Sequence, residues 1–182
     1  MTVLPTIFSL LFATTATATI PSTLNITTIT AHNDQSAIEC WALDPGFTTT
    51  DQAGVSGTAS ISLGPVAGNV TNIIVPGAFD GGSHNAPALQ WVIFLSGVAH
   101  VTLPHSDDEA WIVGGRNGAI LALDTADVSV DGHITQYPTQ ESTVAVEVPL
   151  VQVPGHRVLH GGLVWRGRWG GKYSVLVLGG GL

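Results

Sequence analysis

Short apolar runs, separated by turn residues, dominate the chain from residue 59 onwards. β-Branched and aromatic side chains gather in these runs, and glycine, proline or polar residues close most of them. No stretch of useful length shows the spacing of an amphipathic helix. The pattern therefore predicts strands at residues 59–63, 70–75, 90–96, 98–103, 110–113, 119–123, 128–130, 134–137, 143–148 and 174–178.

Closely spaced strands with turns between them are typical of a single all-β domain, an antiparallel sandwich or barrel. Residues 90–96 and 98–103 flank Gly97, which favours a hairpin. Residues 105–109 include three consecutive carboxylates and predict a polar loop, while residues 114–118 predict a β-turn. Residues 19–58, rich in Thr, Ser, Asn and Gly, predict an arm with one or two short edge strands.

The first 18 residues have the pattern of a secretory signal peptide. An apolar run over residues 3–13 is followed by Ala16-Thr17-Ala18, a small-residue cleavage pattern. A buried N-terminal strand or helix is the alternative. The sequons at Asn25 and Asn69 are glycosylation acceptors in a secreted protein. We thus expect a leader at 1–18, an arm at 19–58 and a barrel at 59–182, in the secretory pathway or outside the cell.

Composition narrows the function classes. Hydrophobic residues make up 45% and charged residues only 10%, which excludes a disordered chain or a coiled coil. The net charge of −8 argues against binding to nucleic acid or to an anionic membrane. The single cysteine, Cys40, excludes an internal disulfide and a cysteine-based zinc site. Because Cys40 lies beside Trp41 in an apolar stretch, we expect it to be buried.

Residues 82–135 carry a set of motifs that resembles the cupin family of small β-barrels. The matching segments are HNAP at 84–87, QWVIFLSG at 90–97, NGAILALDT at 117–125 and GHIT at 132–135. In that family two histidines, a glutamate and a glycine share the first motif. The corresponding residues here are His84, Ala86, Gln90 and Gly97. The resemblance implies an antiparallel cupin-like barrel (a jelly roll) with a ligand site inside it.

Alternation along a regular strand would place His84, Ala86, Ala88, Gln90, Val92 and Phe94 on one face. The resemblance puts that face inside the barrel, together with His133. Asp131, Thr135 and Tyr137 share the parity of His133. We therefore expect His84, Gln90 and His133 to be catalytic, and substrate contacts from Val92, Phe94, Asp131, Thr135, Tyr137 and Arg157.

A metal centre is an open alternative at the same residues. Metal-binding cupins commonly use three imidazoles and a carboxylate, whereas this chain retains His84 and His133 with the neutral amide of Gln90. Two imidazoles and an amide would hold a divalent ion weakly, because no ligand charge offsets its lost hydration. Asp124 or His100 would have to complete the set.

The leading hypothesis is a cofactor-free enzyme that orients an apolar small molecule for cyclisation, cycloaddition or isomerisation, as the resemblance to secreted, metal-poor cupins of microbial secondary metabolism implies. A metal-dependent dioxygenase or isomerase and a non-catalytic binder of hydrophobic metabolites are the alternatives. Edge-strand exchange in cupins also implies a possible homodimer. The sequence leaves open the register of His100 and the roles of His156 and His160.

Overall fold

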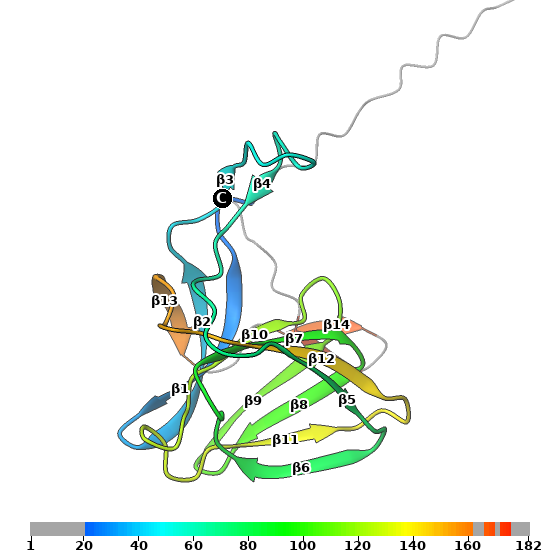
Figure 1. Cartoon of the computed structure of the whole chain (residues 1–182). Coiled ribbons are helices and arrows are strands. Elements are labelled where there is room, and N and C mark those ends of the chain that lie inside the picture. The colour runs from blue at the N-terminus through cyan, green and yellow to red at the C-terminus, as the bar shows by residue number, and fades with distance from the viewer. Residues whose placement is uncertain (1–20, 162–165, 170–171, 176–182) are drawn as a thin grey trace, which may run out of the picture.

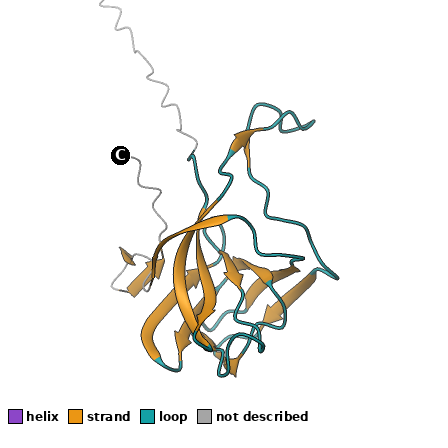
Figure 2. Cartoon of the chain, turned by 90° about the vertical axis from the view of Figure 1, so that its left-hand side faces the viewer, coloured by secondary structure: helices purple, strands orange, loops and turns teal. Residues whose placement is uncertain are grey.

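The computed structural model describes residues 21–161, 166–169 and 172–175, and it is built of β-strands and loops (Figures 1 and 2). Within these residues there is no helix, and hence none long and apolar enough to cross a membrane. The all-β class predicted from the short apolar runs is confirmed. The predicted leader at 1–18 lies outside the described residues.

Two sheets make up most of the fold. The larger has the order β13 (His156–Gly161), β2 (Gln35–Leu43), β1 (Asn25–His32), β10 (Ala119–Ala122), β7 (Gln90–Ser96), β12 (Thr143–Pro149) and β5 (Thr71–Val75). The smaller has the order β6 (Phe79–His84), β11 (His133–Tyr137), β8 (Val98–Leu103) and β9 (Ser106–Val113). All these pairings are antiparallel except that of β1 with β10, and the described strands do not close into a barrel.

Two short hairpins accompany the sheets. β3 (Thr48–Thr49) pairs with β4 (Ala59–Ser60), and both views show this hairpin standing away from the two sheets (Figures 1 and 2). β14 (Arg166–Trp169) pairs with β15 (Lys172–Val175). The predicted strand at 59–63 is therefore reduced to two residues. The one at 174–178 overlaps β15 at residues 174–175, and its residues 176–178 lie outside the described residues.

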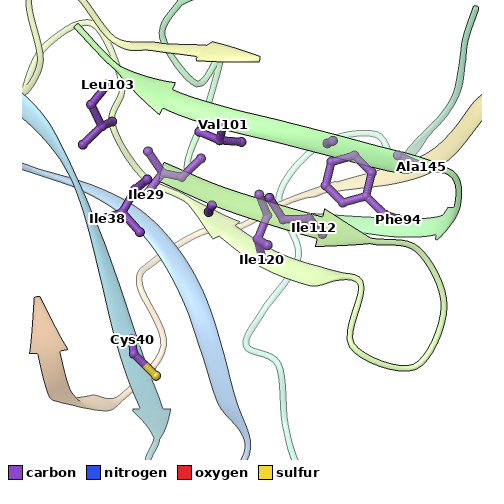
Figure 3. Packing of buried hydrophobic residues seen from close by; sticks show 11 residues of the cluster. Ile29, Ile38, Cys40, Phe94, Val101, Leu103, Ile112, Ile120 and Ala145 are labelled. Atoms are coloured by element: carbon purple, nitrogen blue, oxygen red, sulfur yellow. The ribbon is translucent and has the colours of Figure 1, made fainter. Parts of the chain in front are cut away.

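The main core contains buried residues of both sheets. Alternate side chains of β7, β10 and β12 meet those of β8 and β9, as expected when two half-buried sheets face each other. Figure 3 shows members of this cluster: Ile29, Ile38, Cys40, Phe94, Val101, Leu103, Ile112, Ile120 and Ala145. Cys40 is buried, as predicted, and burial raises the pKa of its thiol.

A second cluster covers the other face of the large sheet. Trp91, Leu121 and Leu123 belong to it, so β7 and β10 are apolar on both faces. The loop that follows β4 packs here through Leu63, whose carbonyl accepts a hydrogen bond from Trp91 Nε1 at 2.7 Å. This explains why these strands read as continuous apolar runs rather than as alternating ones.

The predicted N-terminal arm is wrong for residues 25–43. These residues form β1 and β2, which lie inside the large sheet and pair with each other along their length. Asn33 and Asp34 both have positive φ, the backbone conformation of a tight two-residue hairpin turn. The threonine-rich composition suggested exposure, but threonine is β-branched, and Thr27 and Thr28 are buried here.

The predicted hairpin of β7 and β8 is also wrong. β7 belongs to the large sheet and β8 to the small one, so Gly97 is the corner at which the chain crosses between sheets. β8 instead pairs with β9 through a short turn at Pro104 and His105. Most of the predicted polar loop at 105–109 is therefore strand, because residues 106–109 belong to the outer sheet edge, where carboxylates remain solvated.

Smaller differences concern strand ends and turns. Residues 128–130 form turns rather than the predicted strand, whereas the β-turn at 114–118 is confirmed by a hydrogen bond from Gly118 N to Gly115 O of 3.0 Å. β6 and β13 were not predicted, because glycine and histidine interrupt their apolar pattern. The strands at 70–75, 90–96, 98–103, 110–113, 119–123, 134–137 and 143–148 are confirmed, with small shifts of their ends.

The corner at Gly97 yields a stability prediction. Gly97 has φ +80°, and a Cβ there would collide with Thr143. Gly115 also has positive φ, but a Cβ there would meet open space. We expect Gly115→Ala to lower the free energy of unfolding by about 1 kcal/mol, from backbone strain alone. Gly97→Ala should lower it by about 3 kcal/mol, because overpacking adds to the strain.

Urea unfolding of the two variants beside the parent chain measures this difference. Equal losses for Gly97→Ala and Gly115→Ala would show that the corner is not sterically closed.

Candidate functional site

A cavity of about 360 Å³ lies between the two sheets. Its apolar wall comes from buried side chains of both sheets, among them Phe94, Val101 and Ile120. The exposed residues in the lining are His84 and Pro87, so the cavity reaches the surface beside them. Among the described residues, those that line the cavity are Ile29, His84, Asn85, Ala86, Pro87, Gln90, Val92, Phe94, Val101, Ile120, Ala122, His133, Thr135, Tyr137 and Glu147.

Two histidines from distant segments meet in this lining. His84 ends β6 and His133 begins β11, and the two residues are direct partners in the antiparallel register. Their ring centroids are 4.5 Å apart, with the planes tilted by 58°. His133 is buried, whereas His84 is exposed and its Nδ1 lies 3.0 Å from the carbonyl oxygen of Gly82. The pair thus places one imidazole inside the cavity and one at its opening.

A carboxylate lies behind the buried imidazole. Asp124 follows β10, is completely buried, and its Oδ2 lies 2.7 Å from Nδ1 of His133. Nδ1–H donates to the carboxylate, so this contact selects the tautomer in which Nε2 carries a free electron pair. No hydrogen bond from the described residues reaches Nε2. His133 therefore offers a proton-accepting nitrogen, and the carboxylate stabilises the positive charge that the ring acquires on accepting a proton.

Further hydrogen bonds hold Asp124 in place. Ser36 of β2 donates from Oγ to Oδ2 at 2.6 Å, and its Oγ lies 2.8 Å from that of Ser129. Asn85 Nδ2 donates to the backbone carbonyls of Asp124 and Ser129, at 3.1 and 2.9 Å. These bonds fix the carboxylate from several segments. Its second oxygen, Oδ1, is buried without a partner among the described residues.

A second polar pair lies elsewhere in the lining. Tyr137 of β11 and Glu147 of β12 are both half-buried. Burial, and secondarily the negative charge of Glu147, raise the pKa of the Tyr137 phenol. The phenol therefore keeps its proton at neutral pH and is a hydrogen-bond donor.

Most of the predicted site residues lie together. His84, Gln90, Val92, Phe94, His133, Thr135 and Tyr137 all line the cavity, as does Ala86. Their arrangement differs from the one expected, because residues 85–89 form no regular strand between β6 and β7. Ala88 is outside the lining.

Two predicted substrate contacts lie outside the cavity. Asp131 precedes β11 and is exposed, and its carboxylate lies 2.7 Å from Nε2 of His105. Alternation does not extend to Asp131, because the positive φ of Gly132 ends the extended backbone. Arg157 is exposed on β13, at the far edge of the large sheet, and is not part of the lining.

The three histidines left open by the sequence lie outside the lining as well. His100 stacks on Trp111 and its Nε2 lies 2.8 Å from Glu109, on the face of β8 opposite to Val101. The ring of His156 stacks on Trp41 with a centroid distance of 3.5 Å. His160 is exposed on β13 opposite Cys40. Structural contacts account for His100 and His156.

Sequence reasoning missed the roles of Asp124 and Glu147. Asp124 was considered as a substitute metal ligand and, with Asp127, as a hydrolytic pair that lacked a substrate-binding context. The available signal was that it shares the parity of Ile120 and Ala122, which line the cavity from β10. Glu147 interrupts the apolar run of β12, where alternation with the buried Ala145 was the available signal. In both cases a carboxylate occupies a position that strand alternation assigns to the same face as buried residues.

The predicted glycosylation acceptors differ in exposure. Asn69 lies in an exposed loop before β5. Asn25 begins β1, is half-buried, and its Oδ1 accepts a hydrogen bond from Thr23 Oγ1 at 3.2 Å. Asn69 is therefore the more accessible of the two in the folded chain.

The donor set does not fit the metal that the cupin resemblance implies. Ala86 has no ligand atom, Gln90 offers a neutral amide, and the Asp124 carboxylate faces Nδ1 of His133 rather than a shared centre. In the described part of the chain, no group of three or more His, Cys, Asp or Glu side chains is placed to hold a metal ion. The histidine pair is better suited to proton transfer than to coordination.

Comparisons with known proteins identify no family. No family model matches the chain, and neither a curated protein nor a solved structure is significantly similar to it.

The Asp124–His133 contact predicts a specific NMR signature. In the parent chain we expect His133 to be protonated at Nδ1, with a strongly deshielded proton shared with the carboxylate. Asp124→Asn removes the charge, so this proton signal should move upfield or disappear through exchange. Asp127→Asn is the matched control, because Asp127 is exposed nearby. An unchanged ring spectrum in Asp124→Asn would contradict the tautomer assignment.

We expect the Tyr137 phenol to titrate with a pKa above its ordinary value of 10.0. The ultraviolet titration of the parent chain minus that of Tyr137→Phe isolates this group. Glu147→Gln should lower the pKa but leave it above the ordinary value, because burial is the larger cause. The folded chain retains a proton that the unfolded chain loses, so stability should fall as the pH rises above about 10. A titration at the ordinary value would show that the phenol is solvated.

Proposed function

We propose that the chain is a cupin-like, metal-independent enzyme that transfers a proton to or from an apolar small molecule in the cavity between its sheets. The observation that supports this most is the buried Asp124–His133 pair, whose imidazole faces an otherwise largely apolar space. A base that is fixed in one tautomer and shielded from water is suited to removing a proton from carbon.

The remaining polar groups fit the same chemistry. Gln90 is buried in the lining and can donate from its amide to a carbonyl or hydroxyl oxygen. Tyr137 retains its phenolic proton and can donate in the same way. Negative charge that develops on oxygen when carbon loses a proton is stabilised by such donors. Isomerisation, cyclisation and addition are reactions in which this set would act.

His84 has a different part in the proposal. Its ring contacts that of His133 at the opening of the cavity, where it is exposed. It can exchange a proton with water and return His133 to its starting state after turnover. The apolar side chains Val92, Phe94 and Ile120 would hold the substrate body, because they supply contact area without competing hydrogen bonds.

The proposal includes a location and a fold family. The apolar leader pattern and the exposed sequon at Asn69 favour the secretory pathway. Facing antiparallel sheets with a ligand-sized cavity between them, together with the HNAP and QWVIFLSG motifs, favour a cupin-like jelly roll. Association into a homodimer remains part of the proposal on the strength of the cupin resemblance alone.

A carbon-acid probe tests the proposed proton transfer. In 5-nitrobenzisoxazole, a base removes the proton on carbon, the electron pair forms a nitrile, and the N–O bond breaks to release a coloured phenolate. We expect His133→Ala to lower the protein-catalysed rate at least tenfold, because general base catalysis contributes on the order of 10²–10⁴. Asp124→Asn and His84→Ala should also reduce the rate.

Controls separate the proposal from its alternatives. His105→Ala should keep the parent rate, since His105 is a surface histidine bonded to Asp131. Circular dichroism and thermal unfolding should show that all variants fold. Loss of activity on chelation, with recovery on adding a divalent metal, would favour the metal-dependent cupin. A probe that binds but leaves chemically unchanged would favour a non-catalytic binder, and a full rate in His133→Ala would refute the site.

A further inference from the structure

The cavity contains a carboxylate that the proposed proton transfer does not use. Glu147 lies on β12, directly opposite Val92 of β7, and both residues line the cavity. No hydrogen bond or ion pair from the described residues reaches the Glu147 carboxylate. Its charge contributes to raising the pKa of Tyr137, so the carboxylate lies near that phenol, which also lines the cavity.

No cationic side chain of the described residues balances this charge within the cavity. Among the residues whose side chains the structure describes, the lining contains neither lysine nor arginine, and the whole chain has only five of these residues. Tyr137 offers a neutral hydroxyl at most. A partly buried carboxylate without a counter-charge is costly, and a bound group that brings a positive charge or a hydrogen-bond donor relieves that cost.

Glu147 and the histidines occupy different positions along the cavity. Gln90 pairs with Ala122, two residues before Asp124, so it marks the level of the histidine end. Val92 lies two residues beyond Gln90 on β7, a step of about 7 Å, and Glu147 faces Val92 from the neighbouring strand β12. The cavity therefore has a proton-transfer end and a separate anionic position, with apolar side chains around both.

We propose that Glu147 determines ligand specificity, and that the ligand is an amphiphilic molecule with an apolar body and an amine. A hydroxyl is the weaker equivalent of the amine, because it donates a hydrogen bond without bringing a charge. Molecules with a carboxylate at the same position are rejected by repulsion. This inference rests on the proposed function for the location of the ligand, and it adds the chemical class that the cavity selects.

Three matched probes test this selection: 2-phenylethylamine, 2-phenylethanol and 3-phenylpropionate. They share a phenyl ring and differ in charge, and binding is measured by calorimetry and by backbone amide shifts around Val92 and Phe94. Measurement at pH 8 keeps ordinary imidazoles neutral, so that they do not attract the acid. We expect the amine to bind most tightly and the acid at least tenfold more weakly.

Glu147→Gln should reduce the preference for the amine over the acid to within about twofold, while leaving the binding of the alcohol little changed. Glu141→Gln is the matched control, because it removes the same charge from an exposed loop outside the lining. Equal binding of the three probes, tighter binding of the acid, or an amine preference that survives Glu147→Gln overturns the inference. Absence of amine binding in the low-millimolar range also overturns it.

The two proposals can fail separately. His133→Ala tests the proton transfer from 5-nitrobenzisoxazole, whereas Glu147→Gln tests the amine preference. A parent chain that selects the amine through Glu147 but transfers no proton would refute the proposed function alone. A parent chain that transfers the proton but binds all three probes alike would refute the specificity inference alone.

Discussion

The hydrogen bond between Asp124 and His133 is the interaction on which the site depends. Asp124 follows a strand of the large sheet and His133 begins a strand of the small one, so this bond joins the two layers at one end of the cavity. Ser36 adds a second strand of the large sheet to the same carboxylate oxygen. A charge buried this deeply is tolerable only where hydrogen bonds surround it, so the position of His133 is fixed by its surroundings as well as by its own strand.

Around this bond, the central strands of the large sheet are covered by apolar side chains on both faces. β7 and β10 have one apolar face in each cluster, and they lie near the centre of the large sheet. Ala122 has a short side chain on the face toward the small sheet, and the cavity lies on that side of both strands. The same strands therefore form the core and line the site, as expected when a pocket lies between packed sheets.

The sequence predicted the all-β class and many of the strands because apolar runs such as 90–96 are bounded by glycine and proline. The resemblance to cupins also implied that His84, Gln90 and His133 lie together, as they do in the cavity lining. The prediction failed where the structure depends on which strands pair with each other. No local pattern shows that Gly97 joins two sheets, or that the threonine-rich β1 lies inside one of them. Asp124 was undervalued because its importance comes from His133 and Ser36, which are close to it only in the folded chain.

The unpartnered oxygen of Asp124 bears on how the pair would act. Oδ2 accepts from both His133 and Ser36, while Oδ1 is buried with no donor from the described residues. Because both donors reach Oδ2, they polarise the negative charge of the carboxylate towards the oxygen that faces the ring, where it would stabilise an imidazolium.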